Sequence, residues 1–158
     1  MPRKKTKKLT RIIEPDRIYN SIHIQKLINR VMLDGKKQLA EKIVYGGLQK
    51  AADKLKVQNP LEVFERAMKN IQPHVETRSR RVGGANYQIP YQVRGERRFM
   101  LACRWMIEAA RARKGKPMAE KLALEIMDTA NGESASVKKK LEVQRMAEAN
   151  KAFAHFAR

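Results

Sequence analysis

Residues 78–91 read RSRRVGGANYQIPY, and this stretch predicts a β-hairpin in a chain whose other periodic segments are helical. Apolar and polar residues alternate near Gly83-Gly84, which is the period of a strand, and paired glycines suit a tight turn. An isolated hairpin is marginally stable in water, so we expect this arm, at about residues 74–93, to lean on a helix or a partner. Its arginines and tyrosines suit contacts with phosphates and unpaired bases, which indicates a probe for folded RNA.

The charge of the whole chain points the same way. The 158 residues include 35 Lys and Arg against 16 Asp and Glu, which gives a net charge of +19 and a pI near 10.4. The length fits one domain with a single core. We expect a polyanionic partner, and nucleic acid rather than a membrane, because no segment approaches the ~20 consecutive apolar residues that span a bilayer. No apolar signal segment follows Met1, so the chain is expected to be soluble and cytoplasmic.

The residue types that support catalysis or metal binding are sparse. Cys103 is the only cysteine and lies in an apolar run, so it is interpreted as a buried core thiol. The histidines His23, His74 and His155 are far apart in sequence, so we expect no metal site and no cofactor. Nucleotide-binding glycine loops, nucleophile elbows and deaminase motifs do not occur. We therefore expect neither an enzyme nor a small-molecule substrate; an RNA-modifying enzyme assembled from distant residues remains an open alternative.

Helical periodicity accounts for most of the remaining chain. The clearest start signal is Asn59-Pro60 with Glu62, which combines a capping side chain, a proline in the first turn and an acid beside the helix dipole. The last helix is charged almost throughout and is expected to be weakly held by the core. The predicted helices cover residues 18–33, 39–55, 60–71, 94–113 and 117–131, the last of which ends at Asn131-Gly132. A sixth begins near Ser134 or Ser136 and runs through Ala147.

The two ends of the chain differ from the helical segments between them. Residues 1–11 are strongly basic and almost without apolar side chains, so they predict a disordered tail that orders on RNA. Phe153 and Phe156 follow the last good periodicity and are interpreted either as docking residues or as core contacts. The predicted fold is therefore mainly α: a single domain over residues 12–158, built as a bundle of about six helices with a protruding two-stranded arm.

Basic residues cluster in the tail, at a corner between the first two helices, on the arm and at both ends of the helix at 94–113. Arginines at the start of that helix oppose its dipole and call for an external anion, whereas its basic end suits the dipole. The candidate RNA-binding residues are Arg3, Lys4, Lys5, Lys7, Lys8, Arg11, Lys36, Lys37, Arg78, Arg80, Arg81, Arg94, Arg97, Arg98, Arg111, Arg113, Lys114 and Lys116.

Several separated motifs resemble one known family. Residues 27–43, LINRVMLDGKKQLAEKI, are similar to the signature of ribosomal protein seven of the small subunit. Residues 81–90, RVGGANYQIP, and residues 146–155, MAEANKAFAH, resemble the bacterial and organellar branch of the same family. The resemblance covers essentially the whole chain, while the dense lysine run in the tail and the aromatic Tyr91 depart from the common pattern.

The resemblance implies a function and a set of partners. It implies direct binding to the 3′ major domain of small-subunit ribosomal RNA, a role in starting assembly of the subunit head, and a position near the exit-site transfer RNA and the messenger path. It also implies contacts with small-subunit ribosomal proteins nine and eleven and a place in a cytoplasmic or organellar ribosome. General nucleic-acid binding or repression of a messenger's translation is the alternative function.

Overall fold

The structure, a computed structural model, describes residues 12–157. The predicted disordered tail, residues 1–11, lies outside this range. The described chain contains six α-helices, one 3-10 helix and one two-stranded hairpin, so the prediction of a mainly α fold with a β arm is confirmed. The elements are α1 (Ile22–Val31), α2 (Lys37–Leu55), α3 (Pro60–Ile71), β1 (Val75–Val82), β2 (Ala85–Gln92), α4 (Gly95–Ala112), α5 (Met118–Asn131), α6 (Ala135–Ala149) and η1 (Lys151–Ala157).

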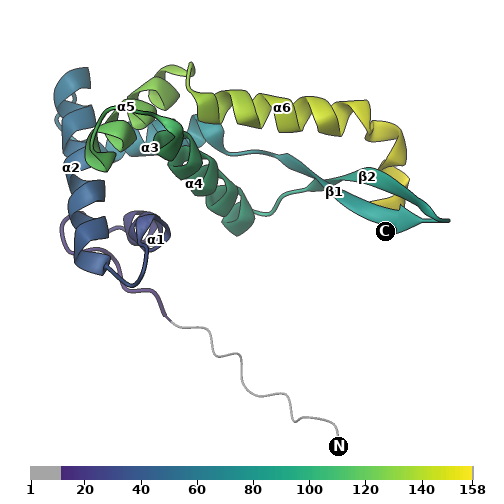
Figure 1. Cartoon of the computed structure of the whole chain (residues 1–158), viewed down its shortest axis with the longest axis horizontal. Helices are drawn as coiled ribbons and strands as arrows, with labels where there is room; N and C mark the ends of the chain where they lie inside the picture. Colours follow the sequence, from purple (N-terminus) through teal and green to yellow (C-terminus); the bar gives the residue numbers. More distant parts are fainter. Residues whose placement is uncertain (1–11, 158) are drawn as a thin grey trace, which may run out of the picture.

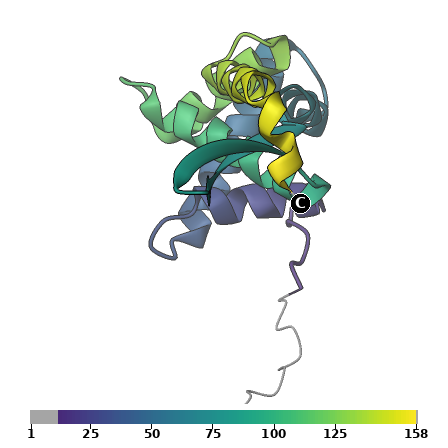
Figure 2. The ribbon, with the colours of Figure 1, turned by 90° about the vertical axis from the view of Figure 1, so that its right-hand side faces the viewer.

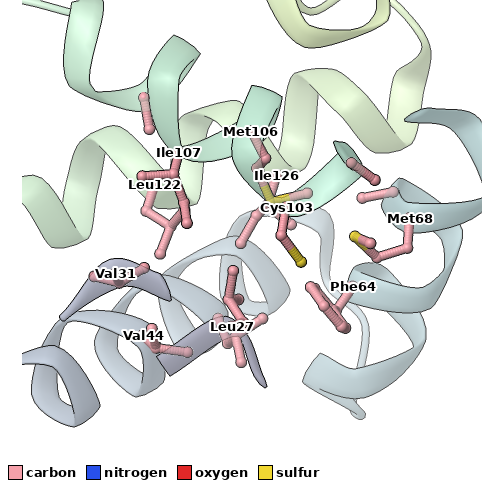
Figure 3. Packing of buried hydrophobic residues seen from close by; sticks show 14 of the residues in the cluster. Leu27, Val31, Val44, Phe64, Met68, Cys103, Met106, Ile107, Leu122 and Ile126 are labelled. Carbon is pink, nitrogen blue, oxygen red and sulfur yellow. The ribbon is translucent and has the colours of Figure 1, made fainter. Parts of the chain in front are cut away.

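The five helices from α1 through α5 share one cluster of buried side chains (Figure 3). Leu27, Phe64 and Met106 come from three different helices and are almost completely shielded from solvent. Cys103 lies in the same cluster, and burial raises the pKa of its thiol to about 12, so the prediction of a buried thiol is confirmed. At Gly47 on α2, an added Cβ would lie 3.2 Å from the carbonyl oxygen of Ala119, so the glycine permits close packing of α2 on α5.

The arm pairs β1 with β2 in an antiparallel register that runs from Val75 opposite Gln92 to Val82 opposite Ala85. The turn residues Gly83 and Gly84 have φ angles of +57° and +90°, the left-handed backbone that a two-residue hairpin turn favours and that glycine adopts without strain. The hairpin predicted around this glycine pair is therefore confirmed.

The arm does not stand alone. Figure 1 shows the arm and α6 extending together away from the helices of the core, and in Figures 1 and 2 the C-terminal segment folds back from α6 onto the hairpin. Ile89 of β2 is fully buried, and Ala147 of α6 is 4% exposed. The expectation that the arm leans on a helix is thus confirmed, and α6 with η1 supplies the support.

The predicted start of the first helix at Ile18 is wrong, since α1 begins at Ile22. The buried carboxylate of Asp16 accepts the backbone N–H groups of Ile18 and Ser21 at 3.1 and 2.8 Å, which holds this segment in a turn. Asn20 completes the turn with a left-handed φ of +50°. The side chain of Ile18 is 62% exposed, so its match to the helical period was fortuitous.

Capping residues predicted the ends of helices more accurately than the hydrophobic period predicted the start of α1. The Asn59 side chain accepts the backbone N–H of Leu61 at 3.0 Å and starts α3 as predicted. Ser134 caps α6 through the N–H of Val137 at 3.1 Å, which decides between the two predicted starts. Gly132 ends α5 with a φ of +88°. Each signal depends on neighbours within three residues, which is why the sequence carries it.

Candidate nucleic-acid interface

The corner between α1 and α2 presents two lysines on a fixed turn. Asp34 and Gly35 both adopt a left-handed backbone, with φ angles of +52° and +72°, and Lys36 and Lys37 follow directly. Both lysine side chains are exposed and make only long ion pairs, 3.9 Å to Asp34 and 3.9 Å to Glu41. Ion pairs this long contribute little, so both ammonium groups can approach a phosphate.

The arm carries its predicted arginines on β1, and all three are exposed. Arg81 lies opposite Asn86, next to the turn. Arg80 donates from Nη1 to the backbone carbonyl of Phe156 at 2.7 Å, which ties the arm to η1. Figure 1 places the arm and the α1–α2 corner at opposite ends of the long axis of the molecule, so the two basic regions can contact separate parts of one RNA.

The base of the arm is organised around a buried acid. Glu76 of β1 is 7% exposed and accepts Arg78 Nε at 2.7 Å and Arg97 Nε at 3.0 Å. Burial alone would raise the pKa of Glu76, but the hydrogen bonds and charges of the two arginines outweigh it and hold the pKa below its usual value. Arg98 donates from Nε to the carbonyl of Val93 at 2.9 Å, which fixes its guanidinium near the start of α4. Arg94, just before α4, is exposed.

The far end of α4 is arranged differently. Arg113 donates from Nη2 to Glu125 at 2.6 Å and to Asp128 at 2.5 Å. Desolvation lowers the pKa of Arg113, but these two carboxylates raise it by more. Glu125 is fully buried and also accepts the Ser136 hydroxyl at 2.5 Å, so the same acid joins the α4–α5 connection to the start of α6. Arg113 therefore forms ion pairs inside the protein, and its contact with RNA stays a prediction.

The neighbours of Arg113 keep more of their surface open. Lys114 and Lys116 are exposed in the connection to α5. Arg111 is exposed as well, with a long contact of 3.5 Å from Nη2 to the carbonyl of Val31. Arg111 therefore lies beside α1, whereas Lys114 and Lys116 belong to the connection between α4 and α5.

The aromatic residues of the arm are already in contact with the protein. The ring of Tyr87 lies 5.0 Å from that of Phe153 and 5.7 Å from that of Phe156, measured between centroids. The Arg78 guanidinium lies over the ring of Tyr91 at 5.4 Å. The two phenylalanines therefore dock on the arm rather than in the main core, and Tyr87 can stack on a base only with the ring surface that η1 leaves open.

Sequence reasoning missed the buried acids. Asp16, Glu76 and Glu125 are all less than a tenth exposed, and none of them was among the candidate residues. Glu76 has a local signal, because an acid two residues before an arginine on a strand lies on the same face as that arginine. The partners of Glu125 are 11 and 12 residues away and depend on how α4, α5 and α6 pack, so no local pattern reveals them.

The described residues contain neither a candidate metal site nor a candidate membrane-spanning helix. Within residues 12–157, no group of three His, Cys, Asp or Glu side chains converges as metal ligands. No helix in that range has the length and apolarity needed to cross a lipid bilayer. Exposed arginines and lysines on a fixed helical scaffold with an extended arm are instead typical of proteins that bind folded RNA.

Comparison with known proteins identifies the family. A family model described as Ribosomal protein S7p/S5e matches residues 2–151. The chain is 57% identical over 146 residues to the small ribosomal subunit protein uS7 of Dictyoglomus thermophilum, covering 92% of this chain and 93% of the relative. It is 52% identical over 158 residues to the uS7 protein of Herpetosiphon aurantiacus, covering 100% and 99%. The chain belongs to this family of small-subunit ribosomal proteins, which are structural constituents of the ribosome rather than enzymes.

Proposed function

We propose that this chain binds directly to the 3′ major domain of small-subunit ribosomal RNA and helps to start assembly of the subunit head. The observation that carries the proposal is the arrangement of exposed cations on separate, fixed elements: the corner at Lys36 and Lys37, the base of the arm at Arg94 and Arg97, and the arm itself. Cations spread over a rigid scaffold can match the phosphates of one folded RNA. Folding of the protein already fixes their positions, so binding costs less conformational entropy.

The arm extends toward the exit-site transfer RNA and the messenger path in this proposal. Its exposed arginines lie on a hairpin that is supported along one side by α6 and η1, which favours a fixed direction over a mobile one. Small-subunit ribosomal proteins nine and eleven are the proposed protein neighbours, and the ribosome is the proposed location. The tail, with Arg3, Lys4 and the other predicted cations, adds phosphate contacts.

The test is the affinity for a transcript of the 3′ major domain, measured over a range of salt concentrations with two competitors. Duplex DNA and an unrelated structured RNA of equal length serve as competitors. We expect the transcript to be retained against both, because phosphate contacts alone give no preference among polyanions. Equal displacement by either competitor would contradict specific recognition of the ribosomal RNA and would favour general nucleic-acid binding.

A further inference from the structure

The buried carboxylate at the base of the arm joins two arginines from different elements. Glu76 lies on β1, where Arg78 is two residues away, and Arg97 lies in the first turn of α4. Arg78 donates Nε to Oε1 of Glu76 at 2.7 Å, and Arg97 donates Nη2 to Oε2 at 2.9 Å and Nε to the same oxygen at 3.0 Å. One acid therefore fixes the directions of both guanidinium groups.

Each guanidinium keeps part of its donor set open to solvent. An arginine has five N–H donors in one plane, and the edge facing Glu76 uses the Nε side of each group. The side chains of Arg78 and Arg97 remain 56% and 50% exposed, while that of Glu76 is 9% exposed. The outer edges can bind a phosphate bidentately, because an arginine fork matches the geometry of phosphate oxygens.

Further contacts limit the freedom of these groups. The Arg78 guanidinium lies over the ring of Tyr91, which lies opposite Glu76 in the arm, and Arg98 donates to the carbonyl of Val93. The backbone N–H of Val93 donates to the carbonyl of His74 at 3.0 Å, which closes the hairpin at its base. The arginines are thus held by hydrogen bonds and packing before any ligand arrives.

Simple electrostatics and this geometry make opposite predictions for the acid. A carboxylate near bound RNA repels phosphate, so its removal should strengthen binding by charge alone. If the acid holds the arginines in a binding geometry, its removal should weaken binding, because the two side chains regain rotamer freedom that the complex must then restrict.

We propose that Glu76 is a positioning residue that aligns Arg78 and Arg97 as a two-guanidinium fork for a backbone phosphate of RNA. The fork lies where the arm leaves the bundle, so the same contact also sets the direction of the arm relative to α4. The inference rests on the proposed function in one respect, since it takes RNA as the ligand, and it adds a subsite and the residue that organises it.

The primary test replaces Glu76 with Gln and compares this variant with Glu108→Gln. Glu108 lies on α4, its side chain is 57% exposed and it pairs with Arg104 at 2.9 Å, so the control removes an equal charge from an ion-paired glutamate. We expect Glu76→Gln to bind the 3′ major domain transcript about tenfold more weakly, the loss of roughly one charge-assisted hydrogen bond. Glu108→Gln should bind as tightly as the parent or more tightly. Equal behaviour of the two variants would overturn the proposal.

A second variant keeps the test decisive if Glu76→Gln fails to fold. Arg97→Lys retains the charge but cannot make the planar bidentate contact, so we expect a similar loss of affinity. In a chain that also carries Glu76→Gln, this second change should add little. Affinity for the transcript unchanged in Arg97→Lys would contradict the fork, because a lysine satisfies a purely electrostatic contact.

The salt dependence separates failure of the fork from failure of the proposed function. Removing one neutralised phosphate from the complex lowers the slope of log affinity against log salt by about 0.7 to 0.9, on any RNA that the fork binds. A parent protein that does not prefer the transcript over unrelated RNA contradicts the proposed function alone. The fork is then judged by the slope on the unrelated RNA, where an unchanged or steeper slope for Glu76→Gln would overturn it.

Discussion

The change Glu125→Ala tests the buried junction at which the α4–α5 connection meets α6. Glu125 is fully buried and accepts the hydrogen bonds that define the junction, among them those from Arg113 Nη2 at 2.6 Å, the Ser136 hydroxyl at 2.5 Å and the Ser136 backbone N–H at 3.3 Å. The alanine variant leaves these donors without their acceptor, and it opens space where the longer side chain was.

The magnitude follows from the exposure of the two partners. Removing one member of a buried ion pair typically costs about 3–5 kcal/mol, because the other charge stays uncompensated. Arg113 is 30% exposed and keeps its bond to Asp128, so the lower end applies, and we expect the free energy of unfolding to fall by about 3 kcal/mol. In a chain of this length, that corresponds to a decrease in Tm of about 6–12 °C.

Urea denaturation followed by circular dichroism measures this change, with Glu133→Ala as the matched control. Glu133 is exposed in the connection between α5 and α6, so its replacement removes the same charge and should change stability by less than about 0.5 kcal/mol. A decrease below about 1 kcal/mol for Glu125→Ala would refute the reasoning, since such a value is typical of surface ion pairs.

Three further predictions concern the arm, the corner and the core. The pKa of Glu76 is lowered in the folded protein, so its ion pairs stabilise the fold fully above the usual carboxylate pKa of 4.5. This contribution disappears as the pH falls through the lower pKa of the folded state. Glu76→Gln should therefore make the free energy of unfolding depend less on pH between pH 6 and 3, as measured by urea unfolding. Replacing Lys36 and Lys37 with alanine should lower the salt slope of RNA binding by about 0.7 to 0.9 for each phosphate that the corner no longer neutralises, and an unchanged slope would mean that the corner faces solvent in the complex. Gly47→Ala should lower the free energy of unfolding by about 1–3 kcal/mol in thermal unfolding, because the added methyl group would lie 3.2 Å from the Ala119 carbonyl oxygen. A neutral or stabilising effect would show that α2 and α5 move apart easily.

The parts of the fold that sequence predicted share a physical cause. The cap at Asn59, the turn at Gly83-Gly84 and the stop at Gly132 each depend on backbone conformations or hydrogen bonds within a few residues. The hairpin and most helices follow from hydrophobic periods that the buried faces then satisfy. The start of α1 was missed because the Asp16 carboxylate, which binds residues of its own loop and of α2 at once, stabilises a turn more than periodicity favours a helix.

The remaining features depend on residues that meet only in the folded chain. Arg97 reaches Glu76 across 21 positions, and Tyr87 meets Phe153 through the return of the chain after α6. On β1, Glu76 is more buried than its apolar neighbour Val75, because Arg78 and Arg97 enclose its carboxylate. Tertiary packing, rather than any local preference, decides these contacts.

The two buried glutamates explain why a count of cations gives an incomplete picture of this surface. Arg97 and Arg113 belong to basic clusters at the two ends of one helix, and the charge pattern of the sequence makes both of them candidate RNA-binding residues. Glu76 pairs with the inner edge of Arg97 and leaves the side chain 50% exposed, whereas Glu125 and Asp128 together enclose Arg113, which is 30% exposed. An arginine held by one buried acid keeps donors for an external phosphate, and one held by two acids uses them within the fold. The position of each acid, more than the total charge of +19, therefore determines which guanidinium groups keep N–H donors available for an external anion.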